Sequence, residues 1–347
     1  MTAPDTTYQL ITQLSNPLFN QESRDDAIRT MAGFNRWEAF HSLCKQHRVV
    51  PLVYSAVTKY ELPLEARALE QLKESAENNV RNMLMLFSLL QHLSSVLKSC
   101  SIPYITVKGP ALSVQLYGTI TMRQSRDIDI LIPAERATDA IHVLLANGYE
   151  PDKKSLNITS GYQRFSRLYR NAGLRHKGSG RMIELHWRLF DGTKEPAWFD
   201  LQEPVVLEKE TFQGLTAQAN LLYLSVHGHH HRWSELGWIT DIHLLNNKIS
   251  PDIAVWDKKL YQRRIQSARD IAAAVYSKQP VPSTVMIKYI TRRITRKKTT
   301  GTAEKIEKFL FLIVSGDFLS QFRLMRMVIN RYFDKIRQHF YLKKPHY

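Results

Sequence analysis

Residues 102–132 read IPYITVKGPALSVQLYGTITMRQSRDIDILI, and this stretch decides the fold. Its first residues, 102–107, are mostly β-branched or aromatic, which predicts a buried strand. Lys108-Gly109-Pro110 predicts a sharp turn, because glycine permits the backbone geometry and proline suits the first turn of a helix. A short helix is expected over 111–117, and Gly118 should end it.

The strand that closes this stretch carries two carboxylates. Side chains alternate along a strand, so Asp127 and Asp129 share one face, about 7 Å apart, while isoleucines occupy the other face. Two carboxylates at that spacing repel each other unless a cation lies between them. Their hard oxygen atoms suit Mg²⁺, which proteins commonly hold through one or two carboxylates together with substrate phosphates. The alternative is a strand that emerges into solvent with two acids at its tip.

The motifs of this stretch resemble those of a known family. Lys108-Gly109, Tyr117-Gly118, Arg123 and Asp127-Ile-Asp129 are similar to the core of DNA polymerase β-type nucleotidyltransferases, in particular the branch called uncharacterised nucleotidyltransferases. The resemblance implies that the turn and Arg123 contact the triphosphate of an NTP, with ATP favoured. It also implies that the two aspartates bind two Mg²⁺ ions, for which Mn²⁺ can substitute. Lys-Gly replaces the more usual Gly-Gly or Gly-Ser, and the spacing from the turn to the aspartates is longer than usual.

The resemblance further implies a third acid on a later strand. Residues 181–189 alternate, with apolar side chains on one side and Glu184, His186 and Arg188 on the other. We therefore expect Glu184 to be the third metal ligand or the general base, and His186 to contact the bound nucleotide. The alternative for Glu184 is an ordinary solvated position on a strand.

Four histidines lie close together in residues 221–242. His227 and His231 have the spacing of neighbours on one helix face, but no glutamate lies between them and no cysteine is near, which disfavours a transition-metal site. The pattern His-Gly-x-x-His-x-Trp followed by Trp-x-x-Asp-Ile resembles a signature of the same family. By that resemblance His227, His231, Trp238 and Asp241 line the catalytic cleft, and Trp238 or Trp233 packs on a base. The alternative is that they join two domains through buried hydrogen bonds.

Composition and charge limit the class of protein and suggest partners. The 347 residues are 44% hydrophobic, which suits an ordinary soluble globular protein, and the longest apolar run, 309–314, is far shorter than the roughly 20 residues that span a bilayer. Two cysteines and no signal peptide predict a cytoplasmic protein without disulfides. The net charge is +16, of which +11 falls in residues 281–347. Such charge attracts triphosphates, and it also suits RNA or peripheral contact with an anionic membrane.

The predicted fold is α+β, with a small mixed-sheet nucleotidyltransferase core between two helical regions. Residues 1–100 are expected to be helical, 101–212 to form the catalytic core, and 213–347 to form a basic helical domain. Within these regions we expect helices over 37–57 (interrupted near Pro51), 64–100 and 134–147, strands over 162–169 and 182–189 around a turn at 173–181, and a cationic amphipathic helix over 308–341.

Taken with the resemblance, the sequence predicts a metal-dependent enzyme. It would move an NMP, AMP in the first instance, from an NTP to a hydroxyl acceptor that the sequence does not identify, and release pyrophosphate. The alternative is a catalytically weak module with the same fold, which binds RNA, an anionic membrane or a partner through its basic C-terminal third.

Overall fold

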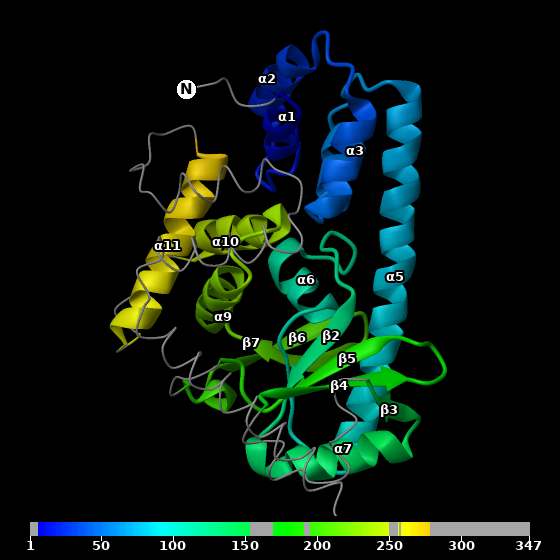
Figure 1. The fold of residues 1–347 in the computed structure, drawn as a ribbon, viewed down its shortest axis with the longest axis vertical. Helices are drawn as coiled ribbons and strands as arrows, with labels where there is room; N and C mark the ends of the chain where they lie inside the picture. Colours follow the sequence, from blue (N-terminus) through cyan, green and yellow to red (C-terminus); the bar gives the residue numbers. More distant parts are fainter. Residues whose placement is uncertain (1–5, 153–168, 191–194, 250–255, 257, 278–347) are drawn as a thin grey trace, which may run out of the picture.

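The computed structural model describes residues 6–152, 169–190, 195–249, 256 and 258–277. Helices at the N-terminal end, a mixed sheet and a second group of helices follow one another, so the predicted α+β class is confirmed (Figure 1). Most of the strand expected at 162–169 and the whole cationic helix at 308–341 lie outside the described residues. Within the described ranges, no helix combines the length and apolar character needed to cross a membrane.

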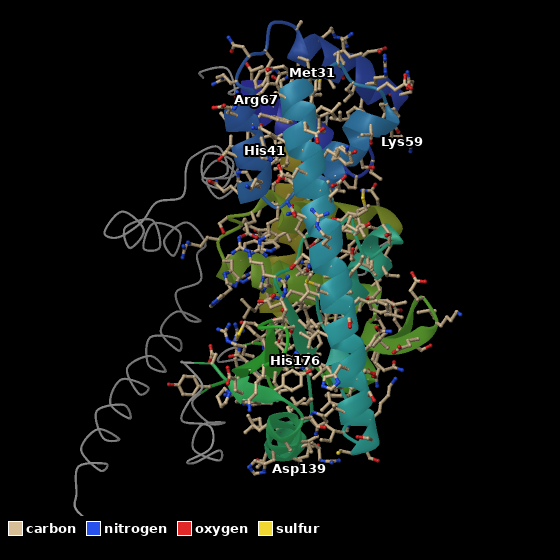
Figure 2. The ribbon with its side chains drawn as sticks, turned by 90° about the vertical axis from the view of Figure 1, so that its right-hand side faces the viewer. Met31, His41, Lys59, Arg67, Asp139 and His176 are labelled. Carbon is tan, nitrogen blue, oxygen red and sulfur yellow. The ribbon has the colours of Figure 1, made fainter. Side chains whose placement is uncertain are left out.

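Five helices make up the N-terminal part. They are α1 (Thr6–Leu14), α2 (Gln21–Met31), α3 (Trp37–Gln46), α4 (Val50–Lys59) and α5 (Ala66–Ser99). The interruption expected near Pro51 is real, because this proline stands in the first turn of α4, where its missing N–H costs nothing. Figure 2 shows the 34-residue α5 running from the N-terminal helices to α7 at the other end. Its predicted apolar stripe is buried, namely Met83, Leu86, Leu90, Leu93 and Leu97.

A seven-stranded sheet has the order β3-β4-β5-β2-β1-β7-β6. Its strands are β1 (Ile105–Thr106), β2 (Asp127–Leu131), β3 (Tyr149–Pro151), β4 (Asn171–His176), β5 (Met182–His186), β6 (Gln202–Leu207) and β7 (Glu210–Leu215). The β2–β5 and β1–β7 pairs are parallel, and the other pairs are antiparallel. The site described below depends on the β2–β5 pair at the centre.

The turn between β1 and α6 (Pro110–Tyr117) has the conformation that its sequence predicts. Gly109 has φ +77° and ψ −147°, a region that only glycine adopts readily, and Gly118 ends α6 in the left-handed conformation. The strand is shorter than the expected 102–107. Its pairing begins later because the N–H of Ile102 donates to Leu97 O and closes the end of α5 instead.

Two features of the sheet differ from the sequence-based expectation. The turn predicted over 173–181 is shorter, because Gly173 and Arg175 continue β4 by pairing with Glu184 and Met182 of β5. The β6–β7 hairpin was not predicted at all. Its strand partner across the sheet, β1, lies about a hundred residues earlier in the chain, so local pattern alone does not indicate the pairing.

Each face of the sheet packs against different helices. The isoleucine face of β2, with Ile128 and Ile130, is fully buried in a core shared with α5 and with α7 (Ala137–Ala146). A short 3-10 helix over Ala134–Arg136 precedes α7. Another core joins the N-terminal helices to α9 (Ala217–His230), α10 (Leu236–Lys248) and α11 (Lys259–Tyr276). A second 3-10 turn, Trp198–Asp200, precedes β6. Because strand side chains alternate, the aspartates of β2 face away from α5 and α7.

Gly228 lets the chain turn tightly after α9. The N–H of Trp233 donates to Gly228 O at 2.7 Å, and the indole, 1% exposed, lies against the glycine. A Cβ at position 228 would come within 2.6 Å of Trp233 Cε3, which real side chains do not tolerate. The His-Gly-x-x-His-x-Trp pattern therefore has a packing basis, and Trp233 belongs to the core rather than to a surface that stacks on a base.

We expect Gly228→Ala to destabilise the protein. Helix propensity alone favours alanine by about 1 kcal/mol, but overlap with the indole costs about 1–3 kcal/mol, so the net loss should be at most about 2 kcal/mol. Urea denaturation measures the loss, and the control is the same change in a Trp233→Leu background, where it should become neutral or stabilising. A Gly228→Ala variant that is more stable than the parent chain would contradict the packing argument.

Candidate active site

The central strands bring two predicted acids side by side. β2 and β5 pair in parallel with Asp129 opposite Glu184 and Asp127 opposite Met182. Neighbours in a paired register lie on the same face, so all three predicted acids are on the face opposite the isoleucines. The expected convergence of Asp129 and Glu184 is therefore observed, and Asp127 lies one alternation further along the same face.

Asp129 is the most enclosed of the three acids, at 1% exposed. Its Oδ1 lies 3.1 Å from His186 Nε2, and its Oδ2 lies 3.2 Å from the Lys108 ammonium. Oδ2 nevertheless accepts no well-oriented hydrogen bond from any described residue. Burial alone would raise the pKa of Asp129, but the charge of Lys108 and the hydrogen bond of His186 outweigh it and hold the pKa below its usual value. Asp129 is therefore a charged carboxylate in a buried position.

Glu184 and His186 complete a compact group of donor atoms. Glu184 Oε2 accepts a hydrogen bond from Asn171 Nδ2 at 2.9 Å and lies 3.4 Å from His186 Nε2, while its side chain stays 40% exposed. The hydrogen bond from His186 lowers the pKa of Glu184 despite its partial burial. One ligand atom each from Asp129, Glu184 and His186 lie within 4.8 Å of one another, a spacing that would suit a metal ion.

Asp127 shows the repulsion that the sequence predicts. Its pKa is raised, first by burial and then by the negative charge of Asp129, and Lys108 offsets only part of this. Lys108 lies two residues after the end of β1, and its side chain is 16% exposed. Burial opposes the charge of Lys108, yet the attraction of Asp129 keeps its pKa above the usual value. A lysine ammonium thus lies where the carboxylates need a cation.

Arg123 and Asp241 form a buried ion pair rather than two separate contacts to a ligand. Arg123 Nε donates to Asp241 Oδ2 at 2.9 Å, Arg123 Nη1 donates to Ser125 Oγ at 2.9 Å, and Tyr117 Oη donates to Asp241 Oδ1 at 2.8 Å. This pair joins the loop before β2 to α10. Helix α5 holds the same loop, since Asn82 Nδ2 donates to Ser125 O at 2.7 Å.

The predicted histidines and Trp238 gather into one row of rings. The centroids of His227 and His231 are 4.5 Å apart, and each lies 5.3 Å from the Trp238 ring. Tyr223 extends the row, 5.7 Å from His227, because residues four apart share a helix face. Burial, and then the charge of Lys108, lowers the pKa of His227 well below its usual value. The row is therefore neutral next to the charged site.

Comparison with known proteins decides the family. The sequence profile described as "Uncharacterised nucleotidyltransferase" matches residues 35–274. The chain belongs to this family. The match includes β2, β5 and the ring row, and it confirms the resemblance drawn from the sequence and supports nucleotidyl transfer as the general activity. A search of curated proteins gave no match.

Two solved structures are similar over part of the chain. One is the lincosamide antibiotic adenylyltransferase LnuA with lincomycin bound, at 19% identity and a TM-score of 0.30, covering 38% of this chain and 82% of that protein. The other is the solution structure of the antibiotic-resistance factor ANT(2'')-Ia, at 12% identity and a TM-score of 0.36, covering 54% and 90% respectively. At these scores neither likeness adds to what the family match says about activity.

Some residues of the candidate site were not predicted from the sequence. Arg48 Nε pairs with Glu235 Oε2 at 3.0 Å, and the positive charge of Arg48 acts on Asp127. Arg48, Arg123 and Trp238 are among the residues that line a small pocket beside the Arg123–Asp241 pair. Nothing local marks Arg48, whereas Tyr223 was detectable from its spacing to His227. Burial raises the pKa of Tyr223 to about 12, while the charges of Lys108 and Asp129 act on it in opposite directions.

We expect Asp241→Ala to be strongly destabilising. Asp241 is 1% exposed, and its removal leaves the Arg123 guanidinium buried without its carboxylate, which should lower the free energy of unfolding by about 3–5 kcal/mol. The matched control is Asp139→Ala, which removes an exposed pair with Arg136 and should cost less than about 1 kcal/mol. Equal urea midpoints for the two variants would show that the Arg123–Asp241 pair does not hold the loop to α10.

Proposed function

We propose that this chain is a metal-dependent nucleotidyltransferase that moves an NMP, AMP in the first instance, from an NTP to a hydroxyl acceptor and releases pyrophosphate. The observation that carries the proposal is the convergence of Asp129, Glu184 and His186 donor atoms within 4.8 Å, next to Asp127 and Lys108. Family membership supports the general reaction, and the site chemistry supports the metal.

The residues fit divalent cations. Three carboxylates on one sheet face need positive charge between them, and Asp129 Oδ2 is buried with an ammonium beside it but no well-oriented hydrogen bond from the described residues. Oxygen donors of this kind suit Mg²⁺, with Mn²⁺ as a substitute, so we assign Asp127, Asp129 and Glu184 to hold two such ions. When bound, the ions would polarise the α-phosphate and neutralise charge on the departing pyrophosphate.

The chain's own groups would then position the substrates. We assign Lys108 to the β- and γ-phosphates, because its ammonium is held at the site as a point charge, and Gly109 to a backbone N–H contact with the same phosphates. Glu184 is partly exposed on the same sheet face, so it would either complete the metal site or, as the alternative role, accept the proton of the acceptor hydroxyl. Arg123 would support the phosphates electrostatically, since Asp241 holds its guanidinium.

We assign the ring row to the nucleotide side of the cleft. His231 is exposed and His227 half-buried, while Trp238 is 8% exposed, so the rings offer an uncharged aromatic edge near the cations of the site. A planar base can pack against such an edge beside phosphates bound at Lys108. In this proposal Asp241 contributes by holding Arg123 in place, and His186 lies beside the carboxylates that hold the metal.

The positive charge of residues 281–347 supports a second candidate, a module that binds RNA or an anionic membrane and turns over weakly or not at all. The two functions predict different products. Only the enzyme should release pyrophosphate from an NTP when Mg²⁺ and an acceptor are supplied.

We expect Asp127→Asn to abolish NMP transfer, with pyrophosphate release falling by at least about 10³-fold, because a neutral amide cannot hold the cations against the triphosphate. The measurement is pyrophosphate release by the purified full chain with each NTP, Mg²⁺ and, in turn, a sugar, an antibiotic-like molecule, a protein hydroxyl and a tRNA end as acceptor. Asp127 is preferred to the buried Asp129 because its replacement disturbs less packing.

The matched control for this assay is Asp139→Asn, an exposed aspartate on α7, which should keep parental activity. Circular dichroism should show both variants folded. Parental turnover by a folded Asp127→Asn chain would overturn the metal assignment, and no pyrophosphate from the parent chain with any NTP would favour the binding module.

A further inference from the structure

We infer that His186 binds the divalent cation directly, through Nε2, and so makes the site prefer Mn²⁺ to Mg²⁺. The inference rests on the proposed function, since it concerns the same metal. The three-acid arrangement expected from the sequence contains oxygen donors alone. The structure instead places an imidazole nitrogen between two of the acids, Asp129 and Glu184.

His186 is positioned by the strand that carries Glu184. It is the last residue of β5 and pairs with Leu131 of β2 and Asn171 of β4, so backbone hydrogen bonds fix it on both sides. Its side chain is 5% exposed. His186 lies two residues after Glu184, so the alternation of side chains along β5 puts both on the same face of the sheet. The His186 ring reaches across to Asp129 in the neighbouring strand.

The distances among the donor atoms match those of ligands around one ion. His186 Nε2 is 3.1 Å from Asp129 Oδ1 and 3.4 Å from Glu184 Oε2. An octahedral ion with ligands at about 2.1 Å holds neighbouring donor atoms about 3 Å apart, because they lie at right angles. A small movement of the Glu184 side chain, the most exposed of the three, toward the other two donor atoms would complete such a set.

A nitrogen ligand changes which metal the site favours. Mg²⁺ takes oxygen ligands and keeps much of its water, whereas Mn²⁺ lies above it in affinity for mixed nitrogen and oxygen donors. The competing explanation is that His186 only hydrogen-bonds the two carboxylates and leaves the metal to oxygen atoms. Both explanations retain a metal-dependent enzyme, and they differ in whether a nitrogen nucleus contacts the ion.

The experiment is pulsed electron paramagnetic resonance of Mn²⁺ bound to the full chain, alone and with a non-hydrolysable ATP analogue. The parent chain should show modulation from an imidazole ¹⁴N nucleus. In His186→Gln the modulation should vanish and Mn²⁺ binding, titrated from the free Mn²⁺ signal, should weaken by more than the roughly 10–100-fold that loss of a group hydrogen-bonded to a metal ligand costs. Mg²⁺ binding, measured by competition against Mn²⁺, should change much less.

Two further variants protect the result against misfolding and against other histidines. His186→Asp replaces nitrogen with oxygen, so it should still bind Mn²⁺, without the modulation and with a smaller preference over Mg²⁺. His142→Gln, an exposed change on α7, should match the parent. Modulation absent from the parent, or retained in both His186 variants, would overturn the inference while pyrophosphate release kept the proposed function. Failure to bind Mn²⁺ under both conditions would overturn both.

Discussion

The register of β2 against β5 is the constraint on which the site depends. Parallel pairing sets Asp129 beside Glu184, and alternation adds Asp127 and His186 to the same face. Carboxylates held this close are unfavourable unless positive charge compensates them, and here the Lys108 ammonium and the His186 ring lie against Asp129. The opposing shifts, with the pKa of Asp127 raised and that of Asp129 lowered, show how unevenly that compensation is distributed. A one-residue slip of β2 would turn Asp127 and Asp129 into the core, away from Glu184 and His186.

The rest of the fold keeps this register and covers the site. Ile128 and Ile130 bury the opposite face against α5 and α7, so the strands cannot slip without exposing apolar surface. On the acid side, the Arg123–Asp241 pair connects the loop before β2 to α10, and the Arg48–Glu235 pair connects the N-terminal helices to the start of α10. The charged site is thus fixed by hydrophobic packing on one face and by buried ion pairs on the other.

Much of the core was predictable from local signals, and the interactions across the site were not. The turn at Gly109, the buried stripe of α5 and the alternation that selects Glu184 follow from residue types at short spacing. The Arg123–Asp241 pair joins residues 118 positions apart. From the sequence, each of the two residues was predicted to contact the ligand separately. His186 was assigned to the nucleotide because strand alternation shows its face but not its reach to Asp129. Arg48 carried no pattern, since its place depends on contact between the turn before α4 and the start of α10, where the Gly237 N–H donates to His47 O.

The most direct test of this account is an anomalous-scattering map from crystals of the full chain grown with Mn²⁺ and a non-hydrolysable ATP analogue. We predict a peak about 2.2 Å from carboxylate oxygens of both Asp129 and Glu184, with the triphosphate adjoining it. Bound nucleotide with no ion within about 4 Å of those two carboxylates would contradict the claim that they form a metal site.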